Sequence, residues 1–132
     1  MEETKNPIKS FTDLIVWQKA VELFQQATGD VEVFPNGRTA AIVADQMMRS
    51  TGAIGANIAE GFGRSGPNAY RYRLSAAKGC ACAAQDWYYK LARLGYLPEA
   101  QANQRIALLT EITKMLGSLI YKLGDREKPA KQ

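Results

Sequence analysis

The stretch Asn57-Ile58-Ala59-Glu60-Gly61-Phe62-Gly63-Arg64 ends a long segment whose apolar residues recur at helical spacing. It places a carboxylate, Glu60, and a guanidinium, Arg64, four residues apart, with Gly61 and Gly63 between them. Glycine commonly follows the end of an α-helix, because it adopts the left-handed cap conformation at little cost. The stretch therefore predicts the end of one helix and a turn into the next.

Four segments of the chain show the three-and-four spacing of apolar residues that is typical of amphipathic helices. Ser10 or Thr12 can cap the first, with Asp13 in its first turn. Residues 31–34 alternate as a strand would, but no second strand is available to pair with them, so we interpret them as a fraying helix end. The expected helices span about residues 12–34, 39–60, 65–94 and 97–124, and Gly95 is expected to stop the third.

Small residues are concentrated in the later half of the second helix and the middle of the third. Gly52 and Gly55 lie in the second, and Gly79-Cys80-Ala81-Cys82 lies in the third. Glycine lowers helix propensity by about 1 kcal/mol relative to alanine. We therefore expect these two helices to face each other in close packing. The alternative is a bent or broken second helix near residues 52–55.

Four amphipathic helices with short connections predict an all-α fold, an antiparallel up-down-up-down four-helix bundle. The expected organisation is a flexible N-terminal arm (1–10), the bundle (11–124) and a flexible charged tail (125–132). The apolar stripes are wider than one core requires, and Trp17, Trp87, Tyr88 and Tyr89 cannot all point inward. The remaining apolar surface predicts a partner, most simply identical subunits.

Composition argues against several classes of site. The chain contains no histidine and only two cysteines, Cys80 and Cys82, so metal sites and histidine-dependent nucleophiles lack their usual residues. We expect no cofactor and no enzyme activity, and we interpret both cysteines as inert small core residues. The polar start of the chain and the short apolar runs predict no signal peptide and no membrane span. Two free thiols suit a reducing cytoplasm.

The charge is distributed unevenly. Residues 1–60 are net acidic, whereas residues 61–85 contain no acidic residue and carry four basic ones: Arg64, Arg71, Arg73 and Lys78. Tyr70 and Tyr72 are interleaved with them, and tyrosine can stack on exposed bases while arginine grips phosphate. The pattern predicts a nucleic-acid-binding face. A solvated helical surface is the alternative, and the spacing leaves open whether these residues share one face. Lys114, Lys122, Arg126 and Lys128 could extend the positive surface.

Glu60 and Arg64 have their own two interpretations. A structural role, fixing a helix end or a subunit contact together with Asn57 and Gly61, is favoured. A catalytic carboxylate is disfavoured, because a lone glutamate lacks the partner acid or base that hydrolysis requires.

Residues 56–64 resemble the four-helix-bundle proteins encoded in intervening sequences of bacterial large-subunit ribosomal RNA genes. Residues 11–20, 94–97 and 111–120 resemble the opening helix, the third connection and the last helix of that family, in the expected order. Gly55 and the small run at residues 79–82 depart from the family pattern.

The resemblance implies a homo-oligomer, a pentameric ring, and kinship with the accessory variability determinant proteins of diversity-generating retroelements. Those are basic pentamers that associate with a reverse transcriptase and with nucleic acid. Two functions therefore stand beside each other. The first is association with RNA or a nucleic-acid–protein complex through the basic residues. The second is a protein adaptor or scaffold, for example for a reverse transcriptase, without a direct nucleic-acid role.

Overall fold

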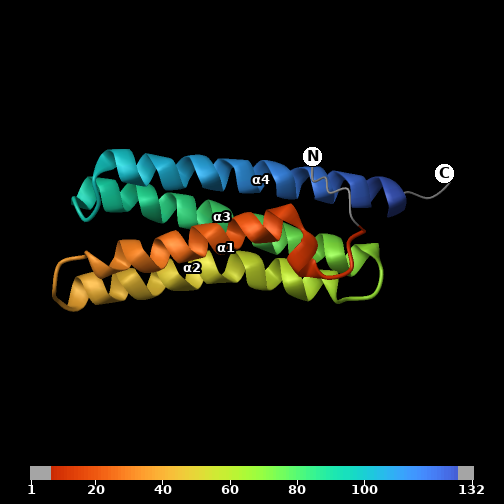
Figure 1. The fold of residues 1–132 in the computed structure, drawn as a ribbon, viewed down its shortest axis with the longest axis horizontal. Coiled ribbons are helices and arrows are strands. Elements are labelled where there is room, and N and C mark those ends of the chain that lie inside the picture. The colour runs from red at the N-terminus through yellow and green to blue at the C-terminus, as the bar shows by residue number, and fades with distance from the viewer. Residues whose placement is uncertain (1–6, 128–132) are drawn as a thin grey trace.

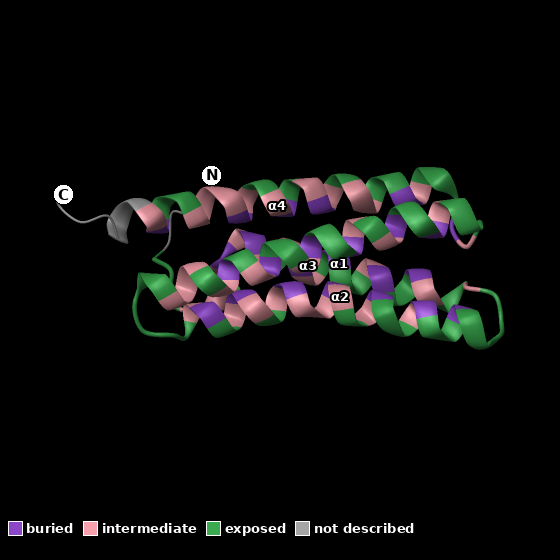
Figure 2. Cartoon of the chain, turned by 180° about the vertical axis from the view of Figure 1, so that it is seen from behind, coloured by how far each residue is buried: buried purple, intermediate pink, exposed green. Residues whose placement is uncertain are grey.

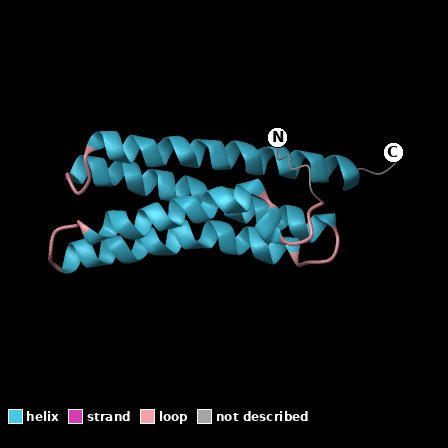
Figure 3. Cartoon of the chain, viewed as in Figure 1, coloured by secondary structure: helices cyan, strands magenta, loops and turns pink. Residues whose placement is uncertain are grey.

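The computed structural model describes residues 7–127 and folds as four long helices joined by short connections (Figures 1 and 3). A single 3-10 turn, η1, precedes them. The elements are η1 (Phe11–Asp13), α1 (Ile15–Glu32), α2 (Arg38–Phe62), α3 (Pro67–Leu94) and α4 (Glu99–Glu127). Across residues 7–127 there is no strand, which confirms the all-α fold and the interpretation of residues 31–34 as a helix end.

Contacts between successive helices show the antiparallel order. Trp17 and Phe24 of α1 lie against Gly55 and Gly52 of α2, so the two helices run in opposite directions. Between α3 and α4, Lys78 lies near Gly117, and Gln85 donates to the Thr110 hydroxyl at 2.7 Å, so these two helices also run in opposite directions. Lys19 pairs with Glu111 at 3.1 Å and thereby joins α1 to α4. The predicted up-down-up-down bundle is confirmed.

Local sequence explains most helix boundaries, with two differences from prediction here. Ser10 and Asp13 form a capping box, but around η1, so that α1 begins only at Ile15. Gly95 adopts the expected left-handed conformation, with φ of 76°. Gly63 does not: its φ is −81°, and α2 ends in a right-handed turn that bonds back to Ala59.

The two ends of the chain differ in part from expectation. α4 extends to Glu127, past the predicted stop at Gly124, because a glycine permits a helix to end but does not require it. At the other end, the backbone N–H groups of Lys9 and Ser10 donate to the Asp13 carboxylate, so the end of the predicted arm is tied to η1. The rest of the predicted arm and tail, residues 1–6 and 128–132, lies outside the described residues.

The second and third helices pack against each other, as predicted, but their glycines at positions 52, 55 and 79 do not make that contact. α2 is continuous, and its glycines accommodate aromatic rings of α1: a Cβ on Gly52 would lie 3.3 Å from Phe24, and one on Gly55 would lie 3.3 Å from Trp17. Gly79 of α3 has open space around it. Gly52 and Gly55 therefore permit close packing of α2 against α1, while α3 packs against α2 and α4.

The core follows the inward faces of the helices, as the buried residues in Figure 2 show. The largest fully buried side chains are Tyr88, Leu23, Met47, Ile54, Ile58, Leu74, Leu91, Leu109, Ile112 and Leu116. Of the four aromatic residues that compete for the interior, only Tyr88 is fully buried. Trp17 and Trp87 are half-buried and Tyr89 is 55% exposed.

One buried polar cluster was not foreseen from the sequence. Asp30 of α1 is only 2% exposed, and its carboxylate accepts four hydrogen bonds. Arg105 donates from Nε at 2.8 Å and from Nη2 at 2.9 Å, Tyr88 donates its hydroxyl at 2.8 Å, and Gln101 donates at 2.6 Å. The cluster joins α1, α3 and α4 and leaves no carboxylate oxygen unpartnered.

Candidate functional site

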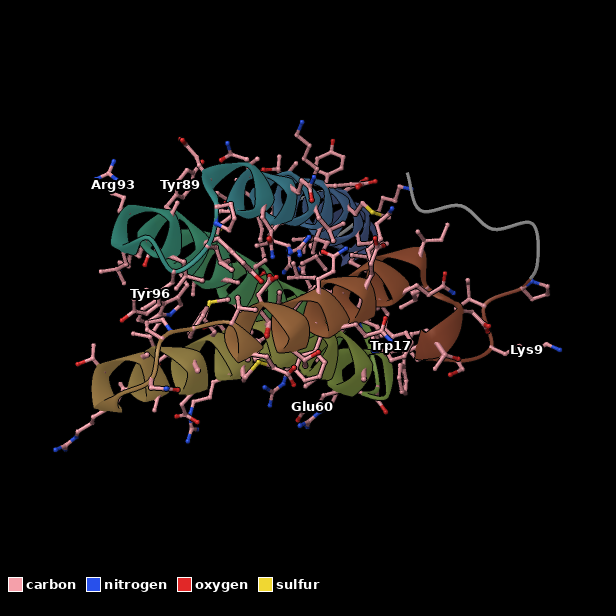
Figure 4. The ribbon with its side chains drawn as sticks, turned by 60° about the vertical axis from the view of Figure 1, so that its left-hand side comes forward. Lys9, Trp17, Glu60, Tyr89, Arg93 and Tyr96 are labelled. Atoms are coloured by element: carbon pink, nitrogen blue, oxygen red, sulfur yellow. The ribbon has the colours of Figure 1, made fainter. Side chains whose placement is uncertain are left out.

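The residues of the 57–64 stretch form a small polar cluster with α3. The Glu60 Oε2 atom is shared by two guanidinium groups: Arg64, one helical turn later, and Arg73 of α3, whose Nη2 lies 3.0 Å away. Glu60 has a 44% exposed side chain, and Figure 4 shows it on the outer surface of α2. One exposed carboxylate therefore holds two arginines, one from the connection after α2 and one from α3.

Asn57 positions Arg73 from the other side. Its amide nitrogen donates to the Ala53 carbonyl at 2.9 Å, which leaves Oδ1 to accept a hydrogen bond from Arg73 Nη1 at 3.3 Å. The same amide lies 3.8 Å from the Cys80 sulfur. Arg73 is thus held by two residues of α2, one turn apart.

Gly61 explains how α3 comes so close at this point. A Cβ on Gly61 would lie 2.7 Å from the Arg73 Cβ and 3.1 Å from the Tyr70 ring. Tyr70 itself packs edge-on against Phe62, with ring centroids 6.1 Å apart. Only glycine fits between α2 and α3 here without movement of a neighbour. The predicted structural role of Asn57, Glu60, Gly61 and Arg64 agrees with this geometry.

The electrostatics of the cluster favour a charged Glu60. The hydrogen bond from Arg64 lowers the pKa of this carboxyl, and the positive charges of Arg73 and Arg64 act in the same direction against a smaller opposing effect of burial. As a result, one negative charge offsets part of the positive charge that Arg64 and Arg73 carry in the sequence.

Arg71 and Lys78 lie elsewhere, against α4. A Cβ on Gly124 would lie 3.2 Å from the Arg71 guanidinium, and one on Gly117 would lie 3.7 Å from the Lys78 Nζ. Arg71 also lines a shallow groove of about 280 Å³ between the helices, together with Asn68, Tyr72, Ser75 and Ile120. The glycines of α4 let these two long cationic side chains lie over the helix.

The four predicted basic residues therefore do not form one patch. Arg64 and Arg73 contact Glu60 of α2, whereas Arg71 and Lys78 lie against α4. Arg71 and Arg73 are two positions apart on α3, so their side chains point about 200° away from each other. The α3–α4 side is the more positive of the two. Neither residues 61–85 nor residues 112–124 contain an acidic residue, and the latter segment also contains Lys114 and Lys122.

Exposed tyrosines accompany the α3–α4 side. Tyr72 of α3 is 70% exposed and Tyr121 of α4 is 72% exposed. Tyr70, which the sequence suggested as a base-stacking residue, is half-buried against Phe62 and does not offer a free ring face. Tyr121 was missed, although its position outside both apolar stripes of the fourth helix was a usable signal.

The thiols and acidic groups of the described residues can be compared with the requirements of a metal site. Within residues 7–127, no three cysteine or acidic side chains gather closely enough to hold a metal ion. Burial raises the pKa of the Cys80 thiol. Cys82 is exposed, so the expectation that both cysteines are core residues is wrong for this one: two positions along a helix turn the side chain by about 200°.

Comparison with known families agrees with this arrangement. A model of the 23S rRNA-intervening sequence protein family matches residues 12–118, which include the first three helices and most of α4. The chain belongs to this family. The match spans the Asn57–Arg64 cluster and both positive sides of α3, so these features lie within the family domain rather than in an appended segment.

A solved structure supports the family assignment. A crystal structure of a protein of unknown function from the S23 ribosomal protein family of Bacteroides thetaiotaomicron superposes with a TM-score of 0.75 at 26% sequence identity. It covers 80% of this chain and 98% of the other. A comparison with curated proteins gives no match. In the described part of the chain, no helix is long and apolar enough to cross a membrane.

Proposed function

We propose that this member of the intervening sequence protein family is a non-enzymatic, homo-oligomeric bundle of the bacterial cytoplasm that associates with RNA through its α3–α4 side. The observation that carries the proposal is the placement of Arg71 and Lys78 over the glycines of α4. Arg71 shares a groove with the exposed Tyr72, and residues 61–85 contain no acidic residue.

Physical chemistry supports such a surface as an RNA contact. Arg71 and Lys78 are seven residues apart, or about 10 Å along the helix, so they would contact separate phosphate groups. Tyr72 and Tyr121 offer exposed rings on which unpaired bases could stack. Because the contacts would be to phosphate and to ring faces, binding would depend on salt far more than on sequence.

Self-association would strengthen the effect. The chain carries a net charge of +4, and a ring multiplies this charge by the subunit count. An apolar groove of about 240 Å³ lies between α1 and α2, on the side of the bundle opposite to the α3–α4 side, and is lined by residues that include Trp17, Phe24, Gly52 and Gly55. We propose a pentamer on the family resemblance. Light scattering of the purified protein tests it, and a strict monomer would contradict it.

Binding to a labelled single-stranded RNA oligonucleotide tests the proposed interface. Lys78→Gln and Arg71→Gln should each weaken binding by about three- to tenfold and lower the salt slope by about 0.7. Arg49→Gln is the matched control: it removes one exposed cation from α2, where Arg49 is paired with Asp45. An equal loss for all three variants would indicate a general charge effect and no α3–α4 interface.

The adaptor role remains the second candidate, because the groove at Trp17 and Phe24 is an apolar surface on which a protein could dock. The two roles separate at the RNA titration. A protein that shows no retention of RNA at low salt, yet keeps a defined protein partner after nuclease treatment, would be an adaptor.

A further inference from the structure

The strongest remaining feature is the Glu60 cluster, which the α3–α4 interface does not use. Two arginines from different elements converge on one carboxylate oxygen: Arg73 at 3.0 Å, and Arg64 in closer contact. Two guanidinium groups around a single anionic oxygen are the arrangement with which proteins bind phosphate. Here the anion is the side chain of Glu60.

The position of Arg73 does not depend on Glu60 alone. Arg73 keeps its hydrogen bond to Asn57, and the Asn57 amide is itself fixed to the Ala53 carbonyl. The contact between Gly61 and the Arg73 Cβ fixes the start of the Arg73 side chain. Arg73 would therefore stay in place if the carboxylate swung away.

Glu60, in contrast, can be displaced. Its side chain is 44% exposed, and that of Arg64 is 51% exposed. Exposed ion pairs contribute only about 0.2–1 kcal/mol, so exchange of the carboxylate for another anion costs little. The Tyr72 ring, 5.8 Å from the Arg73 guanidinium, adjoins the same site and is also part of the α3–α4 side.

We propose that Arg64 and Arg73 form a second phosphate-binding site for RNA, which Glu60 masks by occupying it. An incoming phosphodiester displaces the carboxylate and takes up both guanidinium groups. Because Glu60 competes with the phosphodiester for this site, the affinity of the protein for RNA is lower than it would be without Glu60. RNA as the polyanion rests on the proposed function; the masking by Glu60 rests on the geometry alone.

Fluorescence anisotropy with labelled single-stranded polyuridylate tests the masking. Glu60→Gln should bind the probe about three- to tenfold more tightly than the wild type, with a salt slope steeper by about 0.7, since about 0.7 is expected for each phosphate contacted and the site takes up one phosphate. Asp45→Asn is the matched control: it removes one negative charge from an i,i+4 pair on the same helix, but frees only Arg49. We expect less than a twofold change for it.

Two further variants separate masking from other effects. Adding Arg73→Gln to Glu60→Gln should abolish the gain. Glu60→Asp keeps the charge but shortens the side chain by one methylene, and should give a smaller gain in the same direction. If neither Glu60 variant exceeds Asp45→Asn, the masked site is wrong.

The outcomes also separate this inference from the proposed function. Loss of wild-type binding in Lys78→Gln, with no gain in Glu60→Gln, keeps the α3–α4 interface and overturns the masked site. RNA binding that appears only in Glu60→Gln and requires Arg73 would support the masked site and overturn the α3–α4 interface.

Discussion

Replacing Asp30 by asparagine should be one of the most damaging conservative changes in this protein. The substitution keeps the shape of the side chain but removes its charge beneath Arg105, whose side chain is only 14% exposed. Asparagine also presents an amide nitrogen where the carboxylate now accepts two of its four hydrogen bonds. Removing one partner of a buried ion pair typically costs about 3–5 kcal/mol, because the other charge stays buried and uncompensated.

That cost is a large fraction of the stability of a domain of this size, which is about 5–15 kcal/mol. Urea unfolding followed by circular dichroism measures it. Asp86→Asn is the control, because Asp86 pairs with Lys90 at 2.7 Å on the exposed face of α3; it should change the unfolding free energy by less than about 0.5 kcal/mol. A loss below about 1 kcal/mol for Asp30→Asn would refute the reasoning.

The same variant predicts a pH dependence. Burial alone would raise the pKa of Asp30, but the hydrogen bonds from Arg105, Tyr88 and Gln101 and the charge of Arg105 together outweigh it, so the pKa lies below its usual value of 3.8. A depressed pKa contributes stability that is fully present above 3.8 and is lost as the pH falls through the folded-state pKa. The stability difference between wild type and Asp30→Asn should therefore be constant near neutrality and shrink below pH 3.8. A difference that grows on acidification would contradict the assignment.

Glycine substitutions test the packing in the same urea assay. Gly61→Ala should destabilise the fold by about 1–2 kcal/mol, since overpacking against Arg73 exceeds the gain in helix propensity. Gly79→Ala, with open space around it, is the control and should stabilise the fold by up to about 1 kcal/mol; equal signs for the two would contradict the close approach of α2 and α3. Gly95→Ala should cost about 1–2 kcal/mol through its positive φ alone, and a neutral result would mean that the left-handed cap is dispensable.

The helices and their order were predictable from the sequence, because apolar spacing and turn residues act within a few positions of the chain. Gly95 shows this well: it follows the last apolar residue of the third helix and adopts the left-handed cap. Gly63 shows the limit of the same rule, since a glycine permits a left-handed conformation but does not require it.

The candidate site was predictable in its members but not in its grouping. The sequence identified Arg64, Arg71, Arg73 and Lys78 by their charge and by the absence of acidic residues around them. Which of them share a surface depends on the side on which α3 meets α2 and α4. This side is set by packing across the whole bundle, so the division into a pair beside Glu60 and a pair beside the glycines of α4 appears only in the folded chain.

Contacts between distant residues required the tertiary structure altogether. Asp30 and Arg105 are far apart in the chain, and neither stands out from its neighbours, yet the bundle brings them within 2.8 Å and buries them. Local sequence determined that this chain forms four helices, because helix formation depends on near neighbours. Only the packing of α1, α3 and α4 decided which charge is buried and paired. The free energy of burying and pairing these charges depends on residues from three helices, so no single helix determines it.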